Sequence, residues 1–371
     1  MAAAPKESRA RKQCYRAQVD GKALVRLAQL RGRLATLARG GRFDLAAPML
    51  GELVRADLAL GLPADGLLRA RQAAQLAEGN GEPLAAPLVV LASALLAAGD
   101  TTGAIDAAAL AHQHAAATGE RARFETLARL IGGSAHRRAG RLAEARTMLD
   151  VARGGAARLG ASEIAGLALA ELARVDLAEG HPAGAAVCFE FAAEYFGRAR
   201  RAELAVEAGA LGVVCRALAG DVAAATAAAP RVSDAARALA RADLVAYIDG
   251  ALADVALERE PDAASQACAL AAETADAVPD SQLARDLRAQ ARLRQARVAG
   301  DALDRARHLE AGVDLAMSLP RARAGMLLGA QLVALVDARA DRGELERVCA
   351  ALTATGDAEL ADLARGVIEG A

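Results

Sequence analysis

Hydrophobic and polar positions repeat with the period of an α-helix over most of this chain. Residues 163–179 are the clearest example, because their apolar side chains recur at the three- and four-residue spacings of one helix face. Other leucines lie off that face, which indicates a helix that contacts neighbours on more than one side. The face is formed by Ile164, Leu167, Ala168, Val175 and Ala178.

Turn-forming residues interrupt the helical pattern on a regular grid. One set recurs about every 40 residues, and a second set falls midway, so the pattern predicts helices of about 17 residues joined by tight turns. Such a helix is about 25 Å long. The first set is Gly99, Gly140, Gly180, Gly220, Pro261, Gly300 and Asp341, and the second is Gly79–Gly81, Gly119, Gly160, Gly197, Pro279 and Pro320.

The turns carry a family resemblance. The segment Gly140-Arg141-Leu142-Ala143-Glu144-Ala145 resembles the turn between the two helices of a tetratricopeptide repeat, and the segments that begin at Gly41 and Gly220 are similar without the glutamate. Over residues 80–345 the long period resembles the sensor region of the maltose-regulon activator. The resemblance implies an all-α, right-handed superhelix of about eight antiparallel helix hairpins. HEAT-like repeats remain an alternative, since their period is similar.

Three local expectations follow from the grid. Pro230 falls inside a predicted helix, which we expect to be kinked or split. Near the N-terminus the register is open, because Gly41 matches a hairpin turn whereas counting back from Gly140 places that turn near Gly61. One of the first helices is therefore expected to be an unpaired cap.

Composition and charge refine this interpretation. Alanine, the best helix former, occupies 104 of 371 positions. Residues 1–42 carry 11 Lys and Arg against two acidic residues, a balance of 11 − 2 = +9, so we predict a basic arm over residues 1–20 before a solenoid over 21–371. The arm is expected to bind nucleic acid weakly at most, since no aromatic residues interleave its charges.

Five scattered cysteines and the lack of an apolar leader favour a cytoplasmic protein without membrane insertion. The alanine and arginine bias suggests a bacterial, GC-rich genome.

Motifs of catalysis and metal binding are weak, and we predict no catalytic, cofactor or metal site. The sequence Gly132-Gly133-Ser134-Ala135-His136 lacks the last glycine and the preceding strand of a nucleophile elbow. His112 and His114 lie on different faces of a helix, and His181 stands alone in a turn. The chain is therefore not expected to be an enzyme.

The resemblance implies a groove lined by the first helix of each hairpin. Aligning the turns places six candidate partner-binding residues there, and Arg137, Arg294 and Arg297 are expected to be exposed. Lysine is absent after residue 22, which argues against the family's carboxylate clamp, whereas apolar positions with scattered arginines suit an acidic amphipathic helix. The candidates are Arg137, Arg138, Tyr247, Asp254, Arg294 and Arg297.

Half of the aromatic residues lie in one predicted helix. Phe189 and Phe196 share one face, and Phe191 and Tyr195 share the opposite face, so they form either a core packed on both sides or an exposed anchor. The function we expect is a protein–protein interaction scaffold, adaptor or regulatory subunit that binds a partner peptide or helix in the groove. One alternative is a sensor that binds a small effector, and another is a HEAT-like scaffold whose basic arm contacts nucleic acid.

Overall fold

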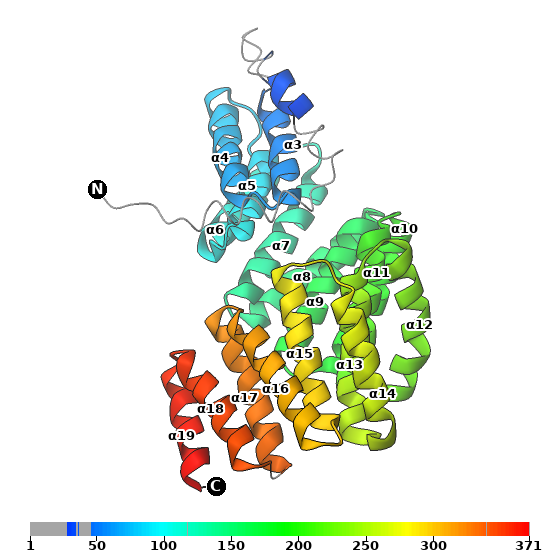
Figure 1. Cartoon of the computed structure of the whole chain (residues 1–371). Helices are drawn as coiled ribbons and strands as arrows, with labels where there is room; N and C mark the ends of the chain where they lie inside the picture. The colour runs from blue at the N-terminus through cyan, green and yellow to red at the C-terminus, as the bar shows by residue number, and fades with distance from the viewer. Residues whose placement is uncertain (1–27, 35, 37–45, 117, 339, 371) are drawn as a thin grey trace, which may run out of the picture. The chain divides into compact units, whose positions relative to one another are not determined.

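The computed structural model describes residues 28–34, 36, 46–116, 118–338 and 340–370, and every regular element among them is a helix (Figure 1). The predicted basic arm and the turn at Gly41 lie outside these residues. The chain divides into two compact units, Met1–Ala205 and Val206–Ala371. No helix in the described ranges combines the length and apolar character needed to cross a membrane.

From residue 46 onward the described residues form seventeen helices that follow one another with short turns. Those of the first unit are α3 (Ala46–Ala59), α4 (Pro63–Gly79), α5 (Ala85–Ala97), α6 (Thr101–Ala115), α7 (Arg121–Arg138), α8 (Leu142–Arg158), α9 (Ser162–Ala178) and α10 (Pro182–Arg198). Helix α11 (Ala202–Leu218) contains the boundary between the units. The second unit continues with α12 (Val222–Ala238), α13 (Ala242–Arg259), α14 (Pro261–Asp276), α15 (Gln282–Val298), α16 (Ala302–Met317), α17 (Arg321–Asp337), α18 (Arg342–Ala354) and α19 (Ala358–Gly370).

Helices pack in hairpins, and the hairpins stack. In the first unit α7 packs against α8, and α9 packs against α10. In the second unit α13 packs against α14, and α15 packs against α16. We call the odd-numbered helices A helices and the even-numbered ones B helices. Successive A helices also touch, as α5 does α7, and α13 does α15. Each unit is therefore a stack of antiparallel helix hairpins, as expected for a tetratricopeptide-like all-α solenoid.

The core of each unit lies between consecutive hairpins. In the first unit Leu130, Leu149 and Leu172 bring α7, α8 and α9 into one buried cluster. In the second, Leu309 and Leu332 belong to a cluster that runs from α15 to α19. Burying one such side chain stabilises the fold by about 2 kcal/mol, and because each cluster joins elements near in sequence, no single large core is needed.

Left-handed residues end several of the helices at positions of the predicted grid. At Gly140, with φ +76°, the amide of Arg141 donates to the carbonyl of His136 at 2.9 Å and that of Gly140 donates to Arg137 at 3.0 Å. This is the Schellman arrangement, which requires a residue with positive φ after the helix. Gly61 adopts a positive φ in the turn between α3 and α4, so the turn near residue 61 continues the grid.

The turn expected at Gly197 is wrong, and of the two outcomes expected at Pro230 the split helix is wrong. Gly197 does not form a turn but lies inside α10, and Arg200 adopts the left-handed conformation at φ 57° instead. Helix α12 is not split at Pro230, but continues through it to Ala238. Pro230 is exposed, so water can satisfy the carbonyl that its missing N–H leaves free.

The aromatic residues of α10 separate into two faces. Phe189 and Phe196 are buried, whereas Phe191 is half exposed. The guanidinium of Arg198 lies 5.0 Å from the ring centre of Tyr195, which is partly buried. Phe189 and Phe196 therefore belong to the core, and Phe191 belongs to the exposed face of the helix.

Candidate functional site

A cavity of about 300 Å³ opens among four consecutive A helices of the second unit. We call it the groove pocket. Aliphatic side chains of α11, α13 and α15 line it together with charged and polar side chains of α13, α15 and α17. The lining residues are Val214, Ala217, Leu218, Ala246, Tyr247, Gly250, Ala251, Asp254, Val255, Glu258, Arg259, Leu287, Gln290, Arg294 and Arg323.

Helical spacing explains how α13 supplies one wall of the groove pocket. Tyr247, Gly250 or Ala251, Asp254 and Glu258 follow one another at three- or four-residue intervals, so they lie along one helix face. Gly250 leaves a gap in this wall because it has no side chain. A Cβ at that position would lie 3.1 Å from Nη1 of Arg294, so the absent side chain leaves room for the guanidinium.

Arg294 is fixed by a two-pronged ion pair. Its Nε donates to Oδ1 of Asp254 at 2.6 Å, and its Nη2 donates to Oδ2 at 2.7 Å. Only 11% of the Arg294 side chain is exposed, against 48% for Asp254. This fork geometry is the strongest form of carboxylate–guanidinium pairing, so it holds both groups in place.

The network extends from α15 to α17. Nη2 of Arg294 also donates to the side-chain oxygen of Gln290 at 3.2 Å, and Nε2 of Gln290 donates to Asp286 at 2.9 Å. Arg323 in turn donates through Nε to Oδ2 of Asp286 at 2.9 Å. Five side chains thus link three A helices across the groove pocket.

The remaining polar groups of the groove pocket have distinct surroundings. Arg259 donates through Nη1 to the carbonyl of Gly220 at 2.9 Å, beyond the C-terminus of α11. Glu258 is exposed. Tyr247 is 41% exposed, and burial of the rest of the ring raises the pKa of its phenol, with Cys215 and Asp286 adding to the effect and Arg323 opposing it.

The structure brings together three of the six predicted residues. Tyr247, Asp254 and Arg294 all line the groove pocket, whereas Arg297 is exposed near the end of α15 and is not among its lining residues. The expectation that Arg294 is an exposed charge is wrong, because Asp254 and Gln290 enclose it.

The other two predicted residues belong to the first unit. Nε of Arg137 donates to Oε2 of Glu171 at 2.8 Å, and that pair is four-fifths buried. Arg138 donates to the carbonyl of Leu96 at the end of α5, 2.8 Å away. Both arginines therefore join neighbouring A helices.

The sequence pattern did not indicate three lining residues, Glu258, Arg259 and Arg323. A signal for the pairing was present, because Asp254 and Arg294 are 294 − 254 = 40 residues apart, the repeat period, and so occupy equivalent positions of adjacent hairpins. Opposite charges at equivalent positions of stacked repeats predict an ion pair.

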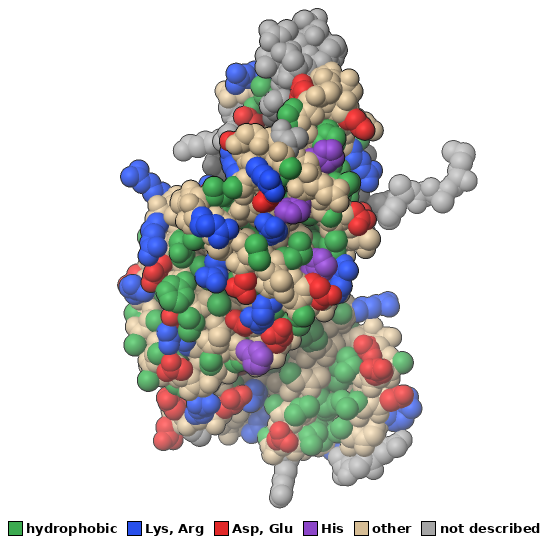
Figure 2. Space-filling model, turned by 180° about the vertical axis from the view of Figure 1, so that it is seen from behind, with side chains coloured by type: hydrophobic (Ala, Val, Ile, Leu, Met, Phe, Trp, Pro, Cys, Tyr) green, Lys and Arg blue, Asp and Glu red, His purple; other side chains and the backbone are tan. Residues whose placement is uncertain are grey.

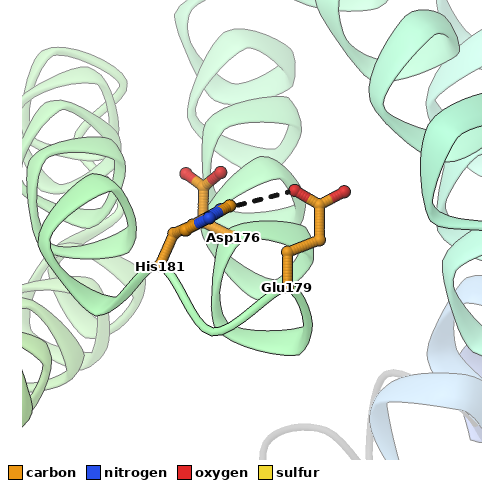
Figure 3. A group of neighbouring side chains, drawn as sticks. All are labelled: Asp176, Glu179 and His181. Atoms are coloured by element: carbon orange, nitrogen blue, oxygen red, sulfur yellow. Dashed lines mark ion pairs between the residues drawn. The ribbon is translucent and has the colours of Figure 1, made fainter.

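A second cluster of polar side chains lies in the first unit. The sequence suggested that His181 stands alone, but two carboxylates lie beside it. Asp176, Glu179 and His181 place one ligand atom each within 4.8 Å of one another (Figure 3). Nδ1 of His181 is 3.7 Å from Oε2 of Glu179, and Sγ of Cys188 is 3.6 Å from Oδ2 of Asp176. In composition these groups could hold a cation.

The guanidinium of Arg146 already occupies the position that such a cation would take. Nη2 of Arg146 lies 2.6 Å from Oδ1 of Asp176 and 2.6 Å from Oε2 of Glu179. Hydrogen bonds to Asp176 and then to Glu179 raise the pKa of Arg146, so it stays charged. We therefore assign this cluster as a cross-link between α8 and the end of α9.

Ser134, the residue nearest to a nucleophile motif, is buried within α7. Its hydroxyl donates to the carbonyl of Leu130, one turn earlier, at 3.0 Å. This local bond engages the hydroxyl proton that a neighbouring base would have to remove.

Comparisons with known proteins find only solved structures of low similarity. No protein-family model matches it, and no curated protein matches it. BtubC (BKLC) from P. vanneervenii is 14% identical with a TM-score of 0.38, over 80% of this chain and 91% of that one. Yeast Tom70 is 10% identical with a TM-score of 0.28, over 93% and 95%. The tetratricopeptide domain of P58(IPK) is 14% identical with a TM-score of 0.22, over 79% and 99%. Similarity at this level identifies no ligand or partner.

Proposed function

We propose that this chain is a non-catalytic protein-binding scaffold that holds a segment of a partner protein in the groove pocket. The observation that carries the proposal is the Asp254–Arg294–Gln290–Asp286–Arg323 network, which links three A helices beside the aliphatic lining residues of the pocket. A site ordered before binding loses little side-chain entropy when a partner arrives. Scaffolds gain affinity from such preorganisation.

Two exposed side chains supply apolar contact area at the pocket. Leu218 is 64% exposed and Tyr247 is 41% exposed. Exposed aromatic residues beside a concavity are typical anchors of protein interfaces, because they bury a large apolar area with few rotatable bonds. The pocket therefore offers both the apolar and the polar contacts that a peptide segment needs.

Site-specific cross-linking tests the proposal. A photo-reactive phenylalanine analogue replaces Tyr247 in the cells that produce the protein, and cross-linked partners are identified by mass spectrometry. The control carries the same analogue at Leu270, a half-exposed position of the B helix α14 outside the groove pocket. We expect a defined protein adduct at position 247 and none at 270. Equal labelling at both positions, or none at 247, would contradict the proposal.

A small effector is the second candidate for the same pocket. Its volume of about 300 Å³ matches the lower end of ligand cavities, and the resemblance to the maltose-regulon activator points to a sensor. Native mass spectrometry of the protein purified from its own cells separates the two. A bound small molecule lost in a Tyr247→Ala variant would favour the sensor, and a retained protein partner would favour the scaffold.

The nucleic-acid alternative rests on the basic arm, which lies outside the described residues. Acidic and basic side chains are interspersed over the described surface seen from behind (Figure 2). Such a mixed surface differs from the continuous basic face that phosphate backbones favour. We therefore rank partner protein above nucleic acid.

We place this function in a reducing cytoplasm. Cys188, Cys215, Cys268 and Cys349 are free in the structure. Thiols remain unpaired in such a compartment. Fractionation of the producing cells checks the placement.

A further inference from the structure

The arginines of the groove pocket all have partners within the chain. Arg294 pairs with Asp254, and Arg323 pairs with Asp286. Arg259 donates to a carbonyl beyond the end of α11, where the negative end of the helix dipole favours a cation. Their positive charges are thus largely compensated before any partner binds.

The carboxylates of the pocket are less completely used. Asp254 accepts both bonds from Arg294 on one side, yet 48% of its side chain is exposed. Glu258, one helical turn further along, is exposed and forms no ion pair with any described residue. Two carboxylates at i and i+4 repel each other by a few tenths of a kcal/mol. A cation placed between them removes that repulsion.

An apolar surface adjoins the two carboxylates. Tyr247 precedes Asp254 by 254 − 247 = 7 residues on α13, a separation of about 10 Å along the helix axis. Ala251 and Val255 line the pocket between and beside them. The methylene stem of a long basic side chain could lie on such a surface while its charge reaches the carboxylates.

We propose that the groove pocket recognises a partner segment with a lysine or arginine that ion-pairs with Asp254 and Glu258 and an apolar residue that packs on Tyr247. The inference rests on the scaffold function proposed above. A spacing of about 10 Å corresponds to two turns of a partner helix or three residues of an extended one. The sequence pattern led us to expect an acidic segment, but the ion pairs of Arg294 and Arg323 reverse the sign of the charge that the pocket can still accept.

Selection from a random peptide library displayed on phage tests the inference with the full chain as bait. Enriched peptides should carry Lys or Arg near an apolar residue, and should compete with each other for the pocket. Their affinities are then measured by fluorescence anisotropy. Glu258→Gln should weaken binding about fivefold, the effect of one partly exposed ion pair. Glu273→Gln, an exposed position of α14, serves as the matched control and should leave the affinity unchanged.

A charge swap adds a readout that a structural effect cannot mimic. Glu258→Lys should abolish binding of a selected peptide, and replacing that peptide's basic residue by glutamate should restore it. Because Glu258 has no ion pair to lose, this variant tests the pocket without breaking the Asp254–Arg294 pair. Raised salt should weaken the native complex.

The outcomes distinguish failure of this inference from failure of the scaffold proposal. Enriched peptides that lack basic residues, or that bind Glu258→Gln as tightly as the native chain, would overturn the inference and leave the scaffold proposal in place if they cross-link to position 247. A library that yields no peptide cross-linking to position 247 would contradict both.

Discussion

At the scale of single residues, arginine side chains connect neighbouring hairpins in two ways. Arg137 and Arg294 pair with carboxylates of an adjacent A helix, Glu171 and Asp254. Arg138 and Arg259, each at the end of an A helix, instead donate to carbonyls at the end of the preceding one. The planar guanidinium suits both tasks, since its donors are arranged in a fixed fork. The near absence of lysine fits this use of positive charge.

The surroundings of Arg294 and Arg297 predict different costs of removal. Arg294→Ala should lower the free energy of unfolding by about 1–2 kcal/mol, because a largely buried bidentate pair is lost while the half-exposed Asp254 can be rehydrated. Arg297→Ala, at an exposed position of the same helix, should change it by less than about 0.5 kcal/mol. Urea unfolding of the two variants gives the comparison. Equal losses would show that the ion pair adds nothing to stability.

Cys188 should react slowly with alkylating reagents. Burial, with the charge and hydrogen bond of Asp176 added, raises the pKa of its thiol to about 11. The reactive thiolate is therefore about 100-fold scarcer at pH 8 than for a thiol with a pKa of 9, and should rise about tenfold per pH unit up to pH 11. The rate of iodoacetamide labelling of Cys188 at different pH values, followed by peptide mass spectrometry, measures this dependence.

Asp176→Asn provides the matching test at Cys188. Loss of the negative charge lowers the pKa of the thiol, so labelling at pH 8 should be faster than in the native chain. Labelling of the urea-unfolded protein gives the reference rate. A native rate equal to that reference would rule out the shift.

At the scale of elements, backbone conformation decides where each helix ends. Among the described residues eight glycines have positive φ, and Arg200 and Ala240 adopt the same conformation at φ 57° and 55°. A residue with a Cβ is strained there by about 1 kcal/mol. The stacking of the hairpins outweighs that strain, which is why the 20-residue spacing continues where glycine is missing.

Two glycine substitutions should have opposite effects. Gly140→Ala should destabilise the chain by about 1 kcal/mol, because residue 140 needs a positive φ. Gly197→Ala should stabilise it by about 0.5–1 kcal/mol, because Gly197 lies inside α10 with no atom within 4 Å of the added Cβ. Thermal unfolding of both variants checks the signs. A stabilising Gly140→Ala would refute the assigned turn.

At the scale of the molecule, stability is local to each stack. The buried cluster that holds α15 to α19 together lies within the second unit, and the cluster around Leu149 lies within the first. In repeat proteins the free energy is approximately a sum over repeats and their nearest neighbours. Damage to one unit should therefore leave much of the other protected.

Hydrogen exchange tests this locality. Leu332→Ala removes a side chain that is 1% exposed and should cost about 2–5 kcal/mol. Exchange should accelerate across α15–α19, and α7–α9 should keep their protection. Leu149→Ala should give the reverse pattern. Uniform acceleration in both variants would show that the chain unfolds as one cooperative body.

The sequence by itself determined the helices and their spacing. Helical periodicity and the glycines that end helices act within a few residues, so positions such as Gly140 and Gly160 could be assigned without a fold. The same local reasoning failed at Gly197, and at Pro230 it left open a split helix that the structure does not show. Helix α12 continues through Pro230, and the left-handed residue that follows α10 is Arg200, three residues after Gly197.

The tertiary structure alone decided which charges are free and which aromatic face is exposed. The candidate residues Tyr247, Asp254 and Arg294 were found by aligning repeats, but the partner of Arg294 lies on another helix. Likewise, the pattern of α10 shows two aromatic faces, and only the neighbouring helices bury Phe189 and leave Phe191 exposed. Electrostatic compensation and burial depend on distances between residues remote in sequence, which periodicity along the chain does not contain.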